Sequence, residues 1–204
     1  MNKSVVLIGA GGHARSVIAL LQNNGFAIKG IYDNSWKADS KETILSIPVC
    51  GTIADVPNHE TICLAVGDNT TREELYHQFS KQVFKEVIEH PNTFIENSAV
   101  LGHSNLVFAN AFINADVKIG NNNILNTGCI IEHECVIGNY NHISVSAILC
   151  GRVRVGNNCF IGAGAIIKDK IKICDNVTIG AGTVVVKDIT EPGVYVGNPS
   201  RKIK

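Results

Sequence analysis

The chain has 204 residues, enough for one large or two small domains, and its 18 basic and 18 acidic residues give a formal net charge of zero. Because no field of one sign surrounds such a molecule, neither nucleic acid nor a membrane surface is an expected partner. Its seven cysteines include no CxxC pair, which favours reduced thiols and a cytoplasmic location. The first residues run directly into a strand-like segment, so no signal peptide or membrane span is expected.

The N-terminal part of the chain alternates short apolar runs with helical patterns. A helix is expected at residues 13–24, and a capping-box pattern at residues 71–74 predicts a second helix that ends near Ser80. This order predicts a βαβ domain over residues 1–90, half of a doubly wound α/β sheet and too short for a complete dinucleotide domain. Strands are expected at residues 4–8, 27–32, 61–66 and 83–89.

A glycine-rich stretch joins the first strand to the first helix. Residues 9–14 read GAGGHA and satisfy the GxGxxG/A pattern, whose amides at a helix N-terminus suit a phosphate group. Asp33 and Asn69 follow the next two strands, so they are expected at the same carboxyl edge of the sheet. The pattern alone allows NAD(P), but the half-size domain favours the pyrophosphate of another nucleotide-linked ligand. The candidate binding residues are Gly11, Gly12, His13, Asp33 and Asn69.

The rest of the chain carries a strict six-residue repeat. A second register, four residues after each aliphatic, holds mostly small residues, and Cys129, Cys135 and Cys159 are expected there as core fillers. A period of six fits a parallel β-helix and neither an α-helix nor an isolated strand. We therefore expect slightly more than five coils over residues 91–190, and a tail at residues 191–204 that breaks the period. The repeated aliphatic residues are Ile95, Leu101, Val107, Ile113, Ile119, Leu125, Ile131, Ile137, Ile143, Leu149, Val155, Ile161, Ile167, Ile173, Ile179 and Val185.

Together these features resemble the hexapeptide-repeat acetyltransferases, and more narrowly the bacterial nucleotide-sugar N-acetyltransferases and sialic acid O-acetyltransferases. The resemblance covers nearly the whole chain. It implies a left-handed parallel β-helix of three flat sheets, a homotrimer, acetyl-CoA bound between neighbouring subunits, and a nucleotide sugar on the glycine-rich loop. The motifs that carry it lie at residues 8–14, 125–127, 131–138, 141–144 and 192–199.

His133 is the candidate general base, because an imidazole has a pKa near working pH. Gly151 lies one 18-residue coil further on, so it should stack beside His133 and leave a backbone N–H open to a thioester carbonyl. The resemblance implies the same two roles, and it implies that Glu134 orients the imidazole. That pairing requires a turn, because consecutive residues of a strand face opposite ways. The alternative is an imidazole without a catalytic role.

The remaining acetyl-CoA contacts come from the resemblance. It implies that His142 binds acetyl-CoA, and that Ala163 and Ala181, each inside a Gly-Ala-Gly triplet, lie along the pantetheine arm. The triplets also suit hexapeptide turns without any ligand. Asn126 is a candidate for contact with the amino sugar, or alternatively for an asparagine ladder that holds the turns together.

These features favour an acetyl-CoA-dependent N-acetyltransferase that acts on a nucleotide-linked amino sugar, expected to be a 4-amino-4,6-dideoxyhexose, by direct transfer and without a metal. The close alternative is O-acetylation of a sialic acid or related sugar. A zinc enzyme would use His133 and His142 but lacks a third ligand at their level. A non-catalytic sugar-binding scaffold is the last alternative.

Overall fold

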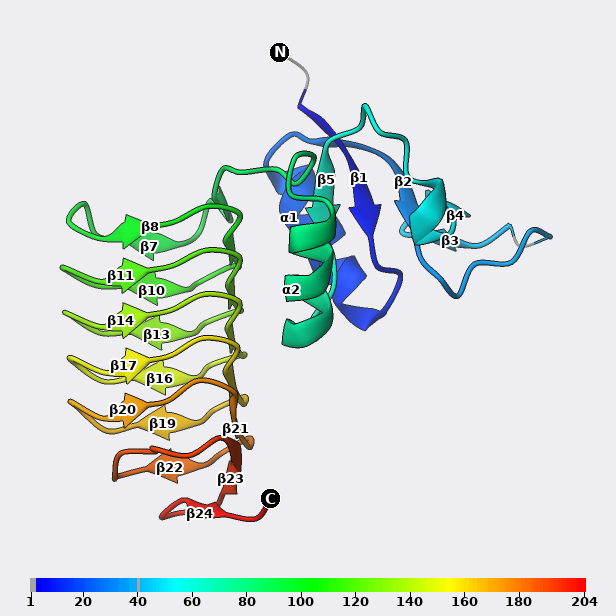
Figure 1. The fold of residues 1–204 in the computed structure, drawn as a ribbon. Coiled ribbons are helices and arrows are strands. Elements are labelled where there is room, and N and C mark those ends of the chain that lie inside the picture. Colours follow the sequence, from blue (N-terminus) through cyan, green and yellow to red (C-terminus); the bar gives the residue numbers. More distant parts are fainter. Residues whose placement is uncertain (1–2, 40) are drawn as a thin grey trace. The chain divides into compact units, whose positions relative to one another are not determined.

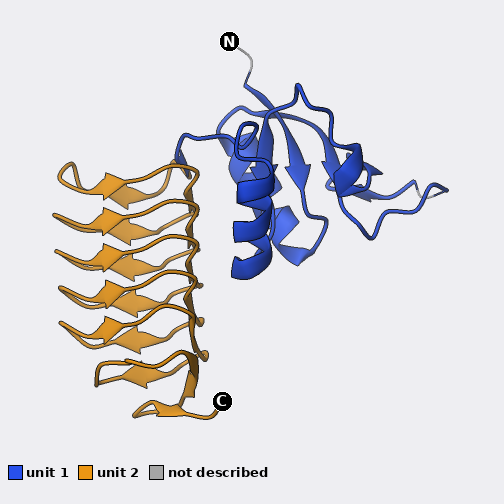
Figure 2. Cartoon of the chain, in the orientation of Figure 1, with its two compact units in different colours: residues 1–88 blue, residues 89–204 orange. Residues whose placement is uncertain are grey.

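The computed structural model describes residues 3–39 and 41–204. The chain divides into two compact units, residues 1–88 and residues 89–204 (Figure 2). Among the described residues, no helix has both the length and the apolar character needed to cross a membrane.

The first unit is an α/β unit built on a five-stranded sheet in the order β3-β4-β2-β1-β5 (Figure 1). Strand β1 pairs in parallel with β2 and β5, and β2 pairs in parallel with β4. Four of the five residues of β1 are buried, as expected for a strand that is covered on both faces. The elements are β1 (Ser4–Ile8), α1 (Gly12–Asn23), β2 (Ala27–Tyr32), β3 (Thr43–Ile44), β4 (Ile47–Gly51), a 3-10 helix (Ile53–Asp55), β5 (Ile62–Leu64) and α2 (Asn69–Gln78).

The structure confirms the first βαβ unit, adds one hairpin and corrects two expectations. The antiparallel β3–β4 hairpin was not predicted. The prediction that a capping box at residues 71–74 begins the second helix is wrong. Helix α2 begins at Asn69, and its N-cap is Asp68, whose Oδ1 accepts a 2.9 Å hydrogen bond from the Thr71 N–H. The strand expected at residues 83–89 is also wrong in extent. Val83 forms only an isolated bridge with Ile62, and β6 is limited to Ile88–Glu89.

The second unit is a parallel β-helix with three sheets, and Figure 1 shows its coils stacked one on the next. Each strand pairs in register with the strand 18 residues further on, as Ile113 does with Ile131 and Ile131 with Leu149. Sheet I contains β7 (Phe94–Ile95), β10 (Phe112–Ile113), β13 (Ile130–Ile131), β16 (Ile148–Leu149), β19 (Ile166–Ile167) and β22 (Val184–Val185). Sheet II contains β8 (Val100–Leu101), β11 (Lys118–Ile119), β14 (Val136–Ile137), β17 (Arg154–Val155) and β20 (Lys172–Ile173). Sheet III contains β6, β9 (Leu106–Val107), β12 (Ile124–Leu125), β15 (His142–Ile143), β18 (Phe160–Ile161), β21 (Val177–Ile179), β23 (Gly193–Val196) and β24 (Arg201–Lys202).

The predicted six-residue registers account for the core of the β-helix. Most of the repeated aliphatic side chains are fully buried, and the thiols of Cys129, Cys135 and Cys159 fill the second register without exposure, as expected. From residue 104 to residue 182 the turns between strands share one conformation, because each contains a residue in the left-handed region. From coil to coil these residues recur at every sixth position: Ser104, Asn110, Asp116, Asn122, Gly128, Glu134, Tyr140, Ser146, Arg152, Asn158, Gly164, Lys170, Asn176 and Gly182.

A buried asparagine ladder joins the coils at the corner between sheets II and III. Asn105, Asn123 and Asn141 are completely buried. Each side-chain oxygen accepts the backbone N–H of the residue 18 positions later, and the last acceptor bond, from the Cys159 N–H to Asn141, is 2.7 Å long. The ladder therefore satisfies backbone donors that would otherwise be buried without partners.

The C-terminal tail departs from the six-residue pattern but still extends the β-helix. Strand β23 pairs in parallel with β21, and β24 folds back against β23 in antiparallel register. This short hairpin covers the open edge of sheet III, which would otherwise be exposed to pairing with another chain.

Candidate active site

The candidate base and its partner lie in the turn between β13 and β14. The His133 Nδ1 is 3.0 Å from the Glu134 Oε2. Glu134 has a φ of 60°, and this left-handed conformation brings two consecutive side chains together, which an extended strand would not allow. The turn that the pairing required is therefore present.

An arginine that was not predicted completes this pair. Arg152 lies one coil after Glu134, and its Nε and one terminal nitrogen are each 3.0 Å from the same Oε2 that His133 contacts. The hydrogen bonds from Arg152 and then from His133 hold the pKa of Glu134 below its usual range. An ionised carboxylate only accepts hydrogen bonds, so the His133 Nδ1 carries the proton in a neutral ring and Nε2 is the atom available as a base.

Gly151 faces the imidazole of His133. A Cβ built at Gly151 would lie 2.7 Å from both the Cε1 and the Nε2 of His133. Any larger residue at position 151 would therefore displace the His133 ring. No described residue accepts a hydrogen bond from the N–H of Gly151, and the same holds for Ala163 and Ala181. These three amides can donate to a ligand.

His142 and Asn126 contact each other across neighbouring coils. The Asn126 Nδ2 is 3.0 Å from the His142 Nε2, and the Asn126 Oδ1 accepts the backbone N–H of Thr127. The His142 ring is 7% exposed and packs edge-on against Phe160, with 5.1 Å between ring centroids. Asn126 therefore has two contacts: its side-chain amide orients the His142 ring, and its side-chain oxygen holds the turn that follows Asn126.

The predicted residues of the β-helix fall into two groups within one chain. His133, Glu134 and Gly151 lie at the corner between sheets I and II. Asn126, Ala163 and Ala181 lie at the corner between sheets III and I, so sheet I separates the two groups.

A cavity of about 340 Å³ lies in the first unit at the carboxyl ends of β1, β2 and β5. Helix α1 begins at Gly12, and its N-cap, Gly11, makes no side-chain cap. A Cβ at either glycine would meet no atom within 4 Å, so the space beside the two glycines at the start of the helix is open, at the helix end that favours an anion. The lining residues are Gly9, Gly11, Gly12, His13, Asp33, Asn34, Ile53, Ala65, Val66, Gly67, Thr71 and Leu75.

Asp33 connects the glycine-rich loop to the end of β2. Its Oδ2 accepts the Ala10 N–H at 2.8 Å, and its Oδ1 accepts the N–H and the hydroxyl of Ser35 at 2.8 and 2.6 Å. Burial opposes ionisation, but the hydrogen bonds from Ser35 and Ala10 outweigh it and hold the pKa of Asp33 below its usual value. The carboxylate therefore fixes the loop conformation while it lines the cavity.

A buried arginine organises the opposite wall. Arg72 is 1% exposed, and its guanidinium donates to the carbonyl oxygens of Val66 and Gly67 and, at 2.8 Å, to the Asn69 Oδ1. Asn69 is thus turned toward Arg72, and Gly67 and Thr71 line the cavity instead. Burial, and then the charge of Arg72, lower the pKa of His13 to about 4, so His13 is neutral near pH 7.

No group of three or more His, Cys, Asp or Glu side chains in the described ranges is arranged to hold a metal ion.

Comparisons with known proteins agree with both units. The PglD N-terminal domain family matches residues 4–79, and the bacterial transferase hexapeptide family, with six repeats, matches residues 152–187. The fold resembles the acetyltransferase domain of PglB from Neisseria gonorrhoeae FA1090 in complex with acetyl coenzyme A, with a TM-score of 0.89 and 28% identity over 100% of both chains. It also resembles a mutant of perosamine N-acetyltransferase from Caulobacter crescentus in complex with CoA and GDP-perosamine, with a TM-score of 0.91 and 32% identity over 98% of this chain and 97% of that one.

A curated relative matches over a shorter segment. An uncharacterized protein of Acanthamoeba polyphaga mimivirus is 35% identical over 105 residues, which is 50% of this chain and 21% of that protein. The chain therefore spans about a fifth of the length of that relative.

The hexapeptide repeats and these similarities identify the chain as a hexapeptide-repeat acyltransferase. Within that class, the chain belongs to the nucleotide-sugar N-acetyltransferase family, with which it shares both units over nearly its full length.

Proposed function

We propose that this protein transfers the acetyl group of acetyl-CoA to the amine of a nucleotide-linked amino sugar. The observation that carries the proposal is the ionised Glu134 on one side of the His133 ring and the open backbone of Gly151 on the other. An amine nucleophile needs a base, and the thioester oxygen needs a donor as it gains charge. Similarity to proteins crystallised with acetyl coenzyme A, CoA and GDP-perosamine supports the two substrates.

In the proposed reaction, the sugar amine attacks the thioester carbonyl while the His133 Nε2 removes a proton from its nitrogen. The N–H of Gly151 donates to the oxyanion of the tetrahedral intermediate. Collapse of that intermediate breaks the C–S bond, and CoA leaves as a thiolate that takes the proton back from His133. Glu134 holds the Nδ1–H throughout, so the ring keeps its orientation as its charge changes. No acyl-enzyme is required.

The proposed nucleotide site is the cavity in the first unit. The open amides at the start of α1 would hold the diphosphate, and Asp33 and the neutral His13 would supply further polar contacts. The fold does not distinguish UDP, dTDP and GDP. A 4-amino-4,6-dideoxyhexose remains the expected sugar, and acetylation of a sugar hydroxyl remains the alternative reaction.

We propose a homotrimer in which a second copy completes each active site. Sheet I presents an apolar residue outward from every coil, and Phe94 and Ile166 are 50% and 39% exposed. The catalytic group and the Ala163 group lie at opposite edges of this sheet, so a neighbouring copy packed along it would bring the two groups together. The stripe consists of Phe94, Phe112, Ile130, Ile148, Ile166 and Val184. The seven cysteines form no disulfide among the described residues, which suits a cytoplasmic enzyme.

A kinetic comparison of the wild type with His133→Ala tests the catalytic assignment. Loss of a general base should lower kcat by about 10²- to 10⁴-fold, with the folded state and the binding of acetyl-CoA retained. A His133→Ala protein with normal kcat would show that another group takes the proton.

A further inference from the structure

The turn between sheets I and II has an unusual choice of residues in its left-handed position. At the other two corners, from residue 104 to residue 182, this position holds asparagine, glycine or serine, with one tyrosine. Between sheets I and II it holds Asp116, Glu134, Arg152 and Lys170 on successive coils, which we term the charged column. Glycine and asparagine adopt this conformation more readily than long side chains do. The backbone therefore does not explain why charged residues occupy this corner.

One step of the charged column joins two opposite charges. Among the described residues, the contact between Glu134 and Arg152 is the only ion pair within the column. Two nitrogens of Arg152 lie 3.0 Å from the Glu134 Oε2, and the His133 Nδ1 lies 3.0 Å from the same oxygen. The backbone N–H of Arg152 also donates to the carbonyl oxygen of His133 at 2.9 Å. Arg152 is therefore bonded to both members of the proposed catalytic pair.

The Glu134 carboxylate depends on these contacts for a fixed position. Its side chain is 47% exposed, and in the described part of the chain only His133 and Arg152 contact its oxygens. An exposed glutamate otherwise samples several rotamers, whereas a planar guanidinium presents its donors at fixed angles. The hydrogen bond from Arg152 is also the largest cause of the lowered pKa of Glu134. Arg152 therefore keeps the carboxylate both ionised and in place.

The position of the carboxylate decides which nitrogen of His133 can act as a base. A neutral imidazole carries its proton on one nitrogen, and a hydrogen bond to an acceptor selects which one. With Glu134 at Nδ1, the proton stays there and the lone pair is on Nε2, the nitrogen that a Cβ at Gly151 would approach to 2.7 Å. If the carboxylate moves away, the tautomer with its proton on Nε2 becomes populated. That tautomer cannot accept a proton at Nε2.

We propose that Arg152 is a positioning residue, which holds the Glu134 carboxylate against Nδ1 and so keeps His133 in the tautomer that can act as a base. This inference rests on the proposed function and deepens it, because it adds a third residue to the proton-accepting group. Arg152 acts through Glu134 and touches neither substrate. Its removal should therefore change the His133 ring and the turnover, but not the binding of either substrate.

Nitrogen NMR of the His133 ring tests the proposal without any substrate. The spectrum is recorded at about pH 9, where an imidazole is neutral, and His133→Ala identifies the ring signals. The wild type should carry the proton on Nδ1 in about nine-tenths of the molecules. Arg152→Met retains a long side chain but has no donor, and it should raise the Nε2–H tautomer to about a third, a change that the loss of one exposed ion pair allows. An unchanged tautomer ratio would overturn the proposal.

Steady-state kinetics test whether Arg152 acts through Glu134. Because the ring loses its fixed orientation as well as its tautomer, Arg152→Met should lower kcat by about three- to tenfold, with both KM values within about twofold of the wild type. In a Glu134→Gln background, Arg152→Met should change kcat by less than about twofold, because the carboxylate through which Arg152 acts is already absent. A rise in either KM, or an undiminished effect in that background, would show that Arg152 contacts a substrate and would overturn the proposal.

Arg152→Lys separates geometry from charge. It retains the positive charge but loses the planar guanidinium, so its kcat should remain below that of the wild type. Full activity in Arg152→Lys would show that charge alone suffices and would overturn the positioning role. Arg152 is 52% exposed, so both Arg152 variants should keep the wild-type unfolding temperature.

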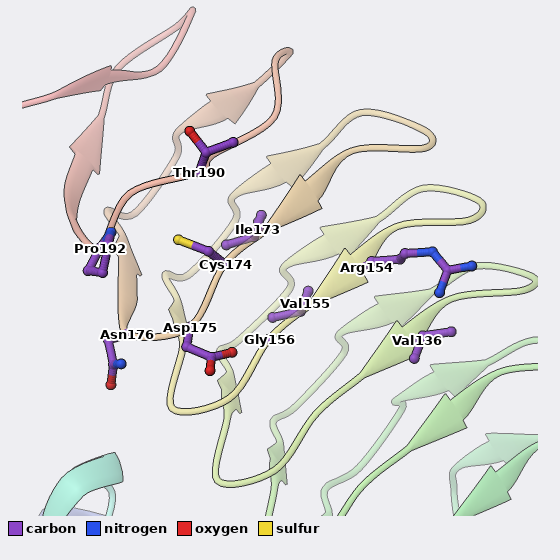
Figure 3. A pocket seen from close by; sticks show the side chains of 10 residues that line it. All are labelled: Val136, Arg154, Val155, Gly156, Ile173, Cys174, Asp175, Asn176, Thr190 and Pro192. Carbon is purple, nitrogen blue, oxygen red and sulfur yellow. The ribbon is translucent and has the colours of Figure 1, made fainter.

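Lys170→Met and Arg154→Met are the matched controls. Both residues line a groove of about 740 Å³ together with Glu134, but neither forms an ion pair with it among the described residues. Lys170 follows Arg152 in the charged column, and its Nζ lies 4.0 Å from Asp169. Figure 3 shows the Arg154 side chain at the edge of a second groove, of about 500 Å³. Each control removes one nearby charge, so kcat and the tautomer ratio should change by less than about twofold. An effect equal to that of Arg152→Met would overturn the proposal in favour of a diffuse field.

The NMR measurement also separates this inference from the proposed function. If the wild type forms no acetylated sugar but Arg152→Met still shifts the tautomer ratio and the controls do not, the proposed function fails and the positioning of His133 stands. If the wild type acetylates the sugar, and neither kcat nor the tautomer ratio responds to Arg152→Met, only the positioning role fails.

Discussion

Adding a single methyl group at Gly151 should displace the proposed base without unfolding the chain. The new Cβ would lie 2.7 Å from the Nε2 and Cε1 of His133, whereas ordinary van der Waals contact begins at 3.4 Å. The imidazole must therefore move by about 0.7 Å. Displacements near 1 Å cost about a hundredfold in rate, so Gly151→Ala should lower kcat by about ten- to a hundredfold, or roughly 1.4–2.7 kcal/mol in the activation free energy.

The coil tolerates a Cβ at this position. Residues with a Cβ occupy the same register at Asp169, one coil later, and at Ala115, two coils earlier, and Gly151 itself does not have a positive φ. Gly151→Ala should therefore keep the circular dichroism spectrum and unfolding temperature of the wild type. Thiol release from acetyl-CoA at saturating sugar measures kcat. A folded Gly151→Ala protein with wild-type turnover would refute the assigned position of His133 beside Gly151.

Four further predictions address other parts of the account. Glu134→Gln removes the anionic partner of the imidazole, and kcat should fall about tenfold or more. The binding of acetyl-CoA, measured as a control, should be unchanged. His13 has a folded pKa of about 4 against 6.5 when unfolded, so the unfolded chain binds more protons between these values. Stability should therefore drop as pH falls from 6.5 to 4, by roughly 3 kcal/mol, and His13→Asn should flatten this dependence in denaturant titrations. Asn141→Val leaves two buried backbone partners unsatisfied and should cost about 2–4 kcal/mol of unfolding free energy. A cost below about 0.5 kcal/mol would show that the asparagine ladder does not stabilise the β-helix. Ile148→Arg should convert the proposed trimer to monomers in sedimentation velocity, with loss of activity.

The β-helix could be predicted in detail because its six-residue period is a local pattern that can be followed along the chain without knowledge of distant contacts. Once coils of 18 residues were inferred, the positions of Gly151 beside His133 and of the cysteines in the core followed from register alone. The same arithmetic would have placed Arg152 beside Glu134. The sequence does not indicate an ion pair there, because a charged residue in a turn is ordinarily solvated, and the geometry shows that the Arg152 guanidinium reaches Glu134.

The first unit was less predictable because its details depend on contacts distant in sequence. The β3–β4 hairpin joins the sheet through pairing with β2, which local propensity does not reveal. At the start of α2, both Asp68 and Thr71 are good caps, and the helix uses Asp68 because the chain leaves β5 earlier than the capping box suggested. The inward turn of Asn69 depends on Arg72, whose burial is a property of the folded unit.

Product analysis tests the central claim most directly. The protein should be incubated with acetyl-CoA and a panel of UDP-, dTDP- and GDP-linked 4-amino-4,6-dideoxy sugars, with CMP-sialic acid and free sialic acid as controls. Mass spectrometry and NMR would then identify the product. We expect one nucleotide-linked sugar to gain a single acetyl group as an amide, with wild-type protein and not with His133→Ala. An acetyl ester on a sialic acid, or no acetylated product from any nucleotide-linked amino sugar, would contradict the proposed function.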